Sequence, residues 1–276
     1  MSLEIRRLSY SLGAEITGMD IRRPFDGDRF EQIHAALLEH SVLLFREQPL
    51  TRAQHVAFSR RFGTLYQDTK FRNDAQIRNN DAGFPEISVN KPGPNPKPSE
   101  YSGEYWHSDL SNTCTPASIS LLRSVEIPPI GGDTLFANMY LAYETLSDGM
   151  KKLLDGLHGI HAPLKVITNN PPLVAHPLVR THAETGRKAL YIGDKVRQLA
   201  GMTVQESAPL IEFLVRHAAR PQFVYRHEWR NDDLLMWDNR CTNHYALGNY
   251  DKALTRHMER TTVLGAPSGY IYDGGC

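Results

Sequence analysis

The chain of 276 residues is 41% hydrophobic, and its 31 basic and 31 acidic residues give a formal net charge of zero. This length and hydrophobicity suffice for one large core, while the neutral charge argues against nucleic acid or an anionic membrane as a natural partner. The start of the chain lacks the apolar core of a signal peptide, and no apolar run approaches the roughly 20 residues of a membrane span.

The cysteines give a further indication of where the protein works. Cys114, Cys241 and Cys276 are odd in number, widely separated and without the spacing of a zinc site. Free thiols in a reducing cytoplasm are the simplest account, so we expect a cytoplasmic protein. Cys241 is interpreted as a packing residue. The sequence has no internal repeat or strong linker, and we predict a single domain over residues 1–276.

The first elements predicted along the chain are two helices with a strand between them. Asp28 to His40 carries apolar residues at helical spacing and gives way to the strand-like run Ser41 to Phe45. Thr51 is placed to cap a second helix, which we expect to run through Arg61 and to end at Gly63.

A proline-rich stretch, Asn90 to Pro98, comes next and leads into the segment Trp106 to Asp109. It can continue neither a strand nor a helix. Its position allows two interpretations, a mobile lid over a functional site or an ordinary surface loop.

The pattern His-x-acid occurs at three places, which are His107/Asp109, His182/Glu184 and His257/Glu259. Any one of them is most simply a surface histidine beside a solvated acid. The first differs in its context, because Trp106 and Leu110 alternate with the polar positions. His107 and Asp109 would then project from the same side of an extended segment.

Further strands and one helix follow in the second half of the chain. Thr203 and Glu206 form a capping-box pattern, but Pro209 lies inside the predicted helix, so we expect it to start late or to bend. The predicted strands are Ile119 to Val125, Ala189 to Ile192, Phe223 to Trp229, Leu234 to Trp237 and Arg260 to Leu264.

A second histidine completes a possible metal site. Asp233 to Arg240 reads as a buried strand running into a polar turn, and His244 follows that turn. With His107 and Asp109 it would supply two imidazoles and one carboxylate. This is the ligand set of non-haem Fe(II) oxygenases, which keep the other face of the metal open.

Two arginines lie shortly beyond His244. Arg256 and Arg260 are four residues apart, so both point to the same face of an extended chain. They can be two solvated residues on a strand. Their position after a candidate iron ligand favours anion recognition instead, because the guanidinium fork matches a carboxylate.

At this point the chain resembles the Fe(II)/2-oxoglutarate-dependent dioxygenases typified by taurine dioxygenase and 2,4-dichlorophenoxyacetate dioxygenase. The resemblance runs along nearly the whole chain, and no single motif carries it alone. The motifs, in order, are Leu12–Gly18, Phe58–Gly63, Trp106–Asp109, Gly131–Thr134, His176–His182 and Trp237–Arg240.

The resemblance implies a mainly β fold with flanking helices and a double-stranded β-helix, or jelly-roll, core. It makes His107, Asp109 and His244 the iron ligands, and Thr134 and Arg256 the residues that hold the distal carboxylate of 2-oxoglutarate. It implies that molecular oxygen is used for hydroxylation, with release of succinate and carbon dioxide. It also suggests a homodimer or homotetramer.

The same resemblance gives expectations about the prime substrate. Arg260 matches the position that meets the acidic group of taurine, but Asp68, Phe71 and Gly103 differ from taurine-contacting residues. The segment from His161 to Pro172 is also shorter than its counterpart. We therefore expect a small organic acid other than taurine.

Aromatic residues near these positions point to the kind of acid. Tyr66, Tyr101, Tyr105 and Phe71 would give the pocket an aromatic wall, which favours an aromatic or bulky acid; for any one tyrosine, core packing is the alternative. Asp68 would make the pocket bipolar, so that the substrate would also carry a hydrogen-bond donor or cation. A solvated loop aspartate is the alternative.

Two other functions use a similar ligand set. One is a zinc-dependent hydrolase or isomerase on a similar barrel, since two histidines and a carboxylate also bind zinc. The other is a catalytically inactive relative that binds a ligand. Neither needs a 2-oxoglutarate pocket, so the presence of Thr134, Arg256 and Arg260 favours the dioxygenase.

Overall fold

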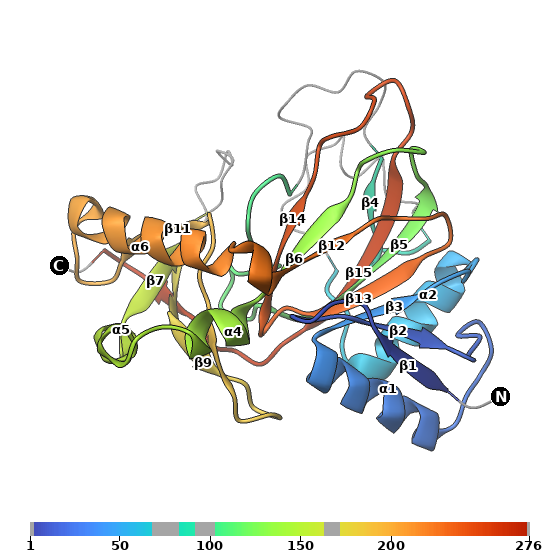
Figure 1. Cartoon of the computed structure of the whole chain (residues 1–276), viewed down its shortest axis with the longest axis horizontal. Coiled ribbons are helices and arrows are strands. Elements are labelled where there is room, and N and C mark those ends of the chain that lie inside the picture. The colour runs from blue at the N-terminus through green and yellow to red at the C-terminus, as the bar shows by residue number, and fades with distance from the viewer. Residues whose placement is uncertain (1–2, 68–82, 92–102, 163–171, 275–276) are drawn as a thin grey trace.

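The computed structural model describes residues 3–67, 83–91, 103–162 and 172–274 and is built around a seven-stranded sheet (Figure 1). In spatial order the strands of this sheet are β1 (Glu4–Arg7), β2 (Ala14–Thr17), β3 (Val42–Phe45), β13 (Leu234–Asp238), β5 (Ala117–Glu126), β15 (His257–Leu264) and β4 (Ser88–Asn90). Neighbouring strands are antiparallel except for β2 and β3, which are parallel.

A smaller sheet packs against this one and completes the core. Its order is β12 (Val224–His227), β6 (Thr134–Asn138) and β14 (Thr242–Ala246). Phe136 of β6 meets Trp237 of β13 with 5.4 Å between ring centroids, and both are buried in one apolar cluster with Leu235 and Met258. The predicted mainly β fold with a jelly-roll core is confirmed.

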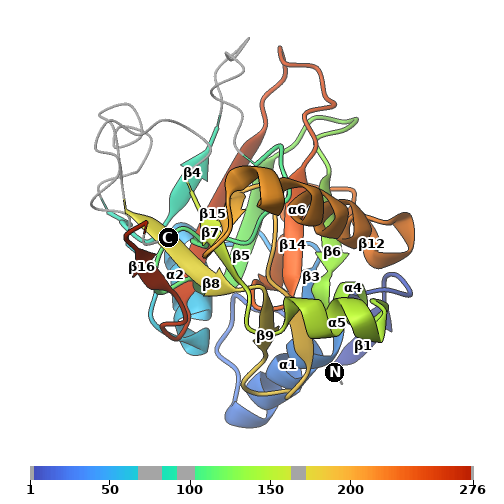
Figure 2. The ribbon, with the colours of Figure 1, turned by 90° about the vertical axis from the view of Figure 1, so that its left-hand side faces the viewer.

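The remaining strands form two small sheets at one end of the molecule (Figure 2). Their strands were not predicted from the sequence, apart from β10. One sheet contains β11 (Val196–Leu199), β7 (His158–His161), β8 (Leu173–Pro177) and β16 (Tyr270–Tyr272), and the other pairs β10 (Lys188–Leu190) with β9 (Val179–Thr181).

Helices flank the sheets at both ends (Figure 1). The α-helices are α1 (Gly27–His40), α2 (Arg52–Ser59), α4 (Met139–Glu144), α5 (Asp148–Leu154) and α6 (Val204–Ala218), and there are 3-10 turns at η1 (Arg60–Phe62) and η3 (Pro221–Phe223). Helix α1 packs on β3 and β13, whereas α6 packs on β11. In the described part of the chain, no helix is long and apolar enough to cross a membrane.

The predicted helices are confirmed with shifted ends. Thr51 makes the expected capping box with Gln54, but α2 stops at Ser59 and the chain tightens into a 3-10 turn before Gly63. Gly63 has a φ of 141°, which a residue with a Cβ rarely adopts. This backbone conformation explains why the 3-10 turn ends there.

The expected late start of the helix near Pro209 is wrong. Helix α6 begins at Val204, directly after the Thr203 capping box, and Pro209 lies inside it. Because the capping box satisfies the first turn and Leu214 is buried on the inner face, these contributions outweigh the one hydrogen bond that Pro209 cannot make.

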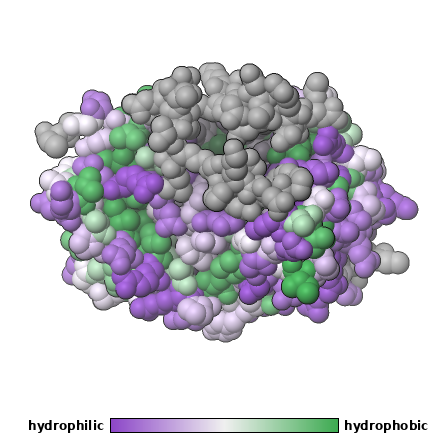
Figure 3. All heavy atoms as spheres, turned by 90° about the horizontal axis from the view of Figure 1, so that it is seen from above, coloured by the Kyte–Doolittle hydropathy of each residue, from purple (hydrophilic) through white to green (hydrophobic). Residues whose placement is uncertain are grey.

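The predicted strands are also present with shifted bounds. β5 and β15 are longer than expected, and β10 is displaced by one to two residues. β12 is shorter, because Phe223 belongs to the 3-10 turn that begins at Pro221. Seen from above, the described surface mixes polar and apolar side chains (Figure 3).

Candidate metal centre and its cavity

Three buried side chains converge between the two core sheets. One ligand atom from each of His107, Asp109 and His244 lies within 4.8 Å of the other two. The Nε2 atoms of His107 and His244 are 3.9 and 4.0 Å from Oδ1 of Asp109. This is the only group of three such residues in the described ranges that is spaced to hold one metal ion.

The backbone fixes the two histidines opposite each other. The amide N–H of His107 donates to the His244 carbonyl at 3.1 Å, and that of His244 donates to the His107 carbonyl at 2.9 Å. His244 lies within β14, beside Phe136 of β6. The sequence placed it after a turn but did not predict this strand.

Asp109 reaches the centre in a different way from the one expected. The extended pairing ends at His107, and Asp109 enters a turn in which Leu110 has a φ of 53°. Asn239 holds this turn, since its carbonyl accepts from Ser108 Oγ at 2.9 Å and its side-chain oxygen accepts from the Asp109 amide at 3.0 Å. The prediction of one extended segment is therefore wrong beyond His107.

The protonation states suit a divalent metal. With Nε2 facing the centre, Nδ1 of His107 donates to the Tyr105 carbonyl at 2.8 Å. Burial lowers the pKa of His107 well below its ordinary value and that of His244 to about 4, so both rings are neutral at pH 7. Neutral imidazoles are the form that binds a metal.

The carboxylate is ionised under the same conditions. Burial alone would raise the pKa of Asp109, but the charge of Arg260 and a hydrogen bond from Ser120 lower it well below its usual range. Ser120 Oγ donates to Oδ2 at 2.6 Å, and Asn239 Nδ2 donates to Ser120 Oγ at 2.9 Å. The three donors thus fit the charge and ligand types that Fe(II) accepts.

Sequence reasoning missed both Ser120 and Asn239. The Trp237–Arg240 motif contained the one available signal, a turn-forming asparagine directly after a buried strand. Nothing in the sequence distinguished Ser120 from the other serines of β5.

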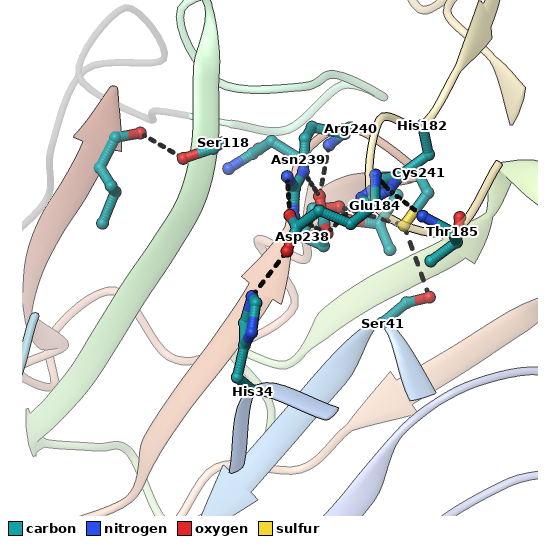
Figure 4. A network of polar contacts seen from close by, with 12 residues as sticks. His34, Ser41, Ser118, His182, Glu184, Thr185, Asp238, Asn239, Arg240 and Cys241 are labelled. Atoms are coloured by element: carbon teal, nitrogen blue, oxygen red, sulfur yellow. Dashed lines mark hydrogen bonds and ion pairs between the residues drawn. The ribbon is translucent and has the colours of Figure 1, made fainter. Parts of the chain in front are cut away.

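A second polar network supports the turn that carries Asn239 (Figure 4). Asp238 accepts hydrogen bonds from His182 Nε2 at 3.0 Å and from Arg240 Nε and Nη2 at 2.8 and 2.7 Å. Arg240 also pairs with Glu184, which is 3.0 Å from Nε2 of His34 on α1. This network ties the β13–β14 turn to α1 and to the β9–β10 turn.

The other two His-x-acid patterns are therefore structural. The interpretation of His182 as a surface residue is wrong, because it is only 3% exposed and bonded to Asp238. His257 is half-buried, and its partner Glu259 is a buried acid paired with Arg52 rather than a solvated one. In both cases packing against a charged network explains the histidine.

A cavity of about 90 Å³ opens beside the two histidine ligands, and its lining includes Thr134, Arg256 and Arg260. Arg256 is buried, and its Nε donates to the Gly132 carbonyl at 3.1 Å. Gly132 has a φ of 73°, and a Cβ there would lie 3.1 Å from Arg256 Nε. The glycine therefore lets the guanidinium lie against the backbone, which accounts for Gly132 in the Gly131–Thr134 motif.

Thr134 and Arg260 face the same cavity, so the prediction that the two arginines share one face is confirmed. Thr134 Oγ1 accepts from Trp229 Nε1 at 3.0 Å, which leaves its own hydroxyl proton for a ligand. Arg260 Nη1 donates to Asp109 Oδ1 at 2.6 Å. The positive charge of Arg260 is therefore paired with the carboxylate of a metal ligand. The sequence did not predict this contact.

The predicted substrate residues have different outcomes. The Tyr105 ring lies against His107, with 4.4 Å between centroids. Tyr66 donates its amide N–H to Thr262 and is not among the residues that line the cavity. Asp68, Phe71, Tyr101 and the proline-rich run from Pro92 to Pro98 lie outside the described residues.

Cys241 has no part in the centre. It is buried, its Sγ is 3.5 Å from Ser41 Oγ, and burial raises the pKa of its thiol. The interpretation of Cys241 as a packing residue is confirmed.

Comparison with known proteins gives consistent matches. The model of the family described as taurine catabolism dioxygenase TauD, TfdA family matches residues 4–262. An alpha-ketoglutarate-dependent 2,4-dichlorophenoxyacetate dioxygenase from Cupriavidus pinatubonensis is 35% identical, with 96% of this chain and 98% of the relative covered.

Solved structures match equally well. The crystal structure of a taurine dioxygenase from Burkholderia xenovorans has a TM-score of 0.85 at 36% identity and covers 100% of this chain and 96% of its own. AAD-2 in complex with Mn(II) and N-oxalylglycine has a TM-score of 0.82 at 30% identity, with 97% and 99% covered.

Proposed function

We propose that this chain, which belongs to the taurine catabolism dioxygenase TauD, TfdA family, hydroxylates a small organic acid that is aromatic or otherwise bulky. The family and the histidine–aspartate–histidine centre make the protein an Fe(II)- and 2-oxoglutarate-dependent dioxygenase. The class of substrate and the roles of the individual residues are our proposal.

The bound iron, with 2-oxoglutarate and oxygen, supplies the oxidation: one oxygen atom enters the substrate and the other enters succinate, while carbon dioxide leaves. His107, Asp109 and His244 would hold the metal. Arg256 and Thr134 would bind the far carboxylate of 2-oxoglutarate through the guanidinium and the hydroxyl proton.

Placing that carboxylate in the cavity requires a cation, because an unpaired buried charge costs several kcal/mol. Arg256 is such a cation, since it is 6% exposed and its Nε donates to the neutral Gly132 carbonyl. Leu122, Trp237 and Met258 line the same space and would exclude water.

The observation that carries the proposal is the shared cavity, in which two histidine ligands, Thr134 and the buried Arg256 face one another. A zinc-dependent hydrolase or isomerase needs the ligands but no second carboxylate pocket. An inactive binding relative needs no complete, correctly protonated ligand set. The dioxygenase uses both features.

For the prime substrate we propose that Arg260 and Tyr105 contribute on the side of the cavity near His107. Arg260 has an Nε without a partner in the described part of the chain, and Tyr105 offers an aromatic face. Tyr66 and Asp68 remain predicted contacts. A relative named for an aryloxy acid supports this class of substrate.

A substrate panel tests the proposal. The protein is incubated with Fe(II), 2-oxoglutarate and oxygen plus 2,4-dichlorophenoxyacetate, phenoxypropionate, octyl sulfate or taurine, and succinate and hydroxylated product are measured. We expect succinate equal to product with at least one bulky acid and little with taurine. Efficient turnover of taurine alone would overturn the proposed class.

We also propose that the protein is a cytoplasmic homo-oligomer, a dimer or a tetramer, composed of single-domain chains. Size-exclusion chromatography with light scattering gives the mass directly. A mass of one chain, 31.2 kDa, at micromolar concentration would contradict the oligomer.

A further inference from the structure

We propose that Lys195, together with His161, forms a subsite that receives the acidic group of the prime substrate. This inference rests on the proposed function, because it adds a recognition element to the same reaction. It concerns a second cavity, separate from the one that contains Arg256.

The second cavity also borders the ligand His107. Its volume is about 10 Å³, and its lining includes Ser108, His161, Lys195 and Asn243 as well as His107 itself. That space admits a group of about the size of one water molecule. It can take the tip of an acidic group, whereas the rest of a substrate must lie outside it.

A buried side chain without polar partners faces this cavity. His161 is 3% exposed, and neither of its ring nitrogens has a hydrogen-bond partner in the described part of the chain. Its ring instead contacts the rings of His176 and Tyr191, at centroid distances of 5.2 and 5.4 Å. A buried imidazole left in this way is costly, so a polar ligand at this position would stabilise it.

The charge around the cavity is positive. Of the basic groups that act on His161, Lys195 and Arg180 carry a charge at pH 7, whereas burial lowers the pKa of His176 to about 4 and leaves its ring neutral. Arg180 lies 4.4 Å above the Tyr191 ring, and one of its terminal nitrogens also lacks a partner in the described residues. An anion would offset the charge of these two half-buried cations.

Lys195 is the cation best placed for that anion. Burial lowers the pKa of its ammonium group to about 8, while the nearby Asp109 raises it. Asp109, however, is already 2.6 Å from Arg260 and hydrogen-bonded by Ser120. Arg260 therefore has its counter-charge, whereas no ion pair of Lys195 is found among the described residues.

The position of Lys195 suits a substrate that reacts at the metal. Its Nζ lies 6.0 Å from the centroid of the Tyr105 ring, and that ring lies 4.4 Å from the His107 ring. An acid bound at Lys195 would be next to Tyr105 and to a metal ligand. The remainder of the molecule is thereby kept close to the centre.

The test uses the protein loaded with Fe(II) and 2-oxoglutarate under anaerobic conditions, where added substrate perturbs the visible absorption band. The probes are 2,4-dichlorophenoxyacetate, its neutral amide and octyl sulfate, titrated into wild type and Lys195→Met. We expect Lys195→Met to weaken binding of the acid about 10- to 100-fold and that of the amide by less than about twofold. Comparison of the carboxylate with the sulfate shows which head group the subsite prefers.

Three further variants complete the experiment. Lys195→Arg should recover most of the binding because it keeps the charge, and His161→Phe should weaken binding of the acid while keeping the ring contacts. Lys188→Met, at an exposed position of β10, is the matched control and should bind every probe as wild type does.

The outcomes separate this inference from the proposed function. A wild-type protein that develops no visible band with Fe(II) and 2-oxoglutarate contradicts the proposed function itself. A normal band with unchanged acid binding in Lys195→Met, or equal losses for acid and amide, overturns the subsite alone. Failure of both acids to bind the loaded wild type overturns it as well.

Discussion

The hydrogen bonds to Asp109 show how single residues outside the metal centre set its geometry. One oxygen of the carboxylate faces the two imidazoles and Arg260, and the other accepts from Ser120. Such partners fix the orientation of a metal ligand, and the loss of one typically lowers metal affinity about 10- to 100-fold. They therefore offer a test that leaves all three ligands in place.

Ser120→Ala is expected to weaken Fe(II) binding about 10- to 100-fold, because Asp109 Oδ2 loses its donor. Ser120→Thr keeps a hydroxyl and should recover part of the affinity. Ser118→Ala is the control, since Ser118 lies on the same strand and its hydroxyl donates to the backbone carbonyls of Val263 and Leu264. Anaerobic metal titration measures all three, and equal affinities would contradict the role of Ser120.

Arg256→Ala should weaken 2-oxoglutarate binding by about 3–5 kcal/mol, because a buried carboxylate loses its cation. The control is Arg197→Ala, an exposed arginine. Titration of 2-oxoglutarate into the iron-loaded protein gives the affinity. Similar affinities in the two variants would show that the far carboxylate binds elsewhere.

Arg260→Ala provides the comparison between the two arginines. It should leave 2-oxoglutarate affinity within about tenfold of wild type and weaken prime-substrate binding and metal retention, since Arg260 pairs with Asp109. If the two arginine variants lost 2-oxoglutarate affinity equally, the separate roles given to Arg256 and Arg260 would be wrong.

At the scale of elements, the turn between β13 and β14 connects the fold to the centre. Asn239 in this turn orients Asp109, and the neighbouring Asp238 is held by His182 and Arg240. The network therefore stabilises the position of the turn without touching the metal. Its loss should affect stability more than metal binding.

His182→Ala should lower the free energy of unfolding by about 1–3 kcal/mol, because Asp238 loses a buried hydrogen bond but keeps Arg240. Urea unfolding measures this change. The folded fraction should still bind Fe(II), unlike His107→Ala. Loss of metal binding at unchanged stability would instead place His182 in the centre.

The sequence predicted those parts of the site whose residue types carry the chemistry. His107, Asp109 and His244 could be proposed because their residue types match the ligand set of Fe(II), and Arg256 because a guanidinium suits an anion. Thr134 was proposed only from the resemblance to a known family. Their supports were missed, because a serine in a strand or an asparagine in a turn is common and carries no signal of its own.

Elements were predictable where local patterns were strong. Helices α1, α2 and α6 have caps and apolar spacing that can be read from a short window. β14, with the sequence Thr-Asn-His-Tyr-Ala, has no apolar alternation, and its pairing with β6 depends on residues over 100 positions away. Long-range register of this kind cannot be read from local sequence.

For the whole molecule, several buried histidines link stability to pH. Burial lowers the pKa of His55, His176 and His244 from 6.5 to about 4. Between these values the unfolded chain takes up protons that the folded chain does not. The stability that these histidines contribute is therefore fully present above pH 6.5 and is lost as the pH falls toward 4.

Urea unfolding of the metal-free protein at pH 7.5, 6 and 5 should show this decrease, with up to about 1.4 kcal/mol per pH unit for each such histidine. His55→Gln should reduce the slope, because it removes one titrating group that is distant in sequence from the centre. A stability that stays constant between pH 7 and 5 would contradict the account of the buried histidines.

The most direct test of the central claim, a metal centre that binds 2-oxoglutarate, is the visible charge-transfer band of the anaerobic protein with Fe(II) and 2-oxoglutarate. The wild-type protein and His158→Ala, a substitution at a half-buried histidine outside the centre, should both develop the band. His244→Ala should not, because it keeps only two of the three protein ligands. Absence of the band in the wild type, or a full band in His244→Ala, would contradict the account.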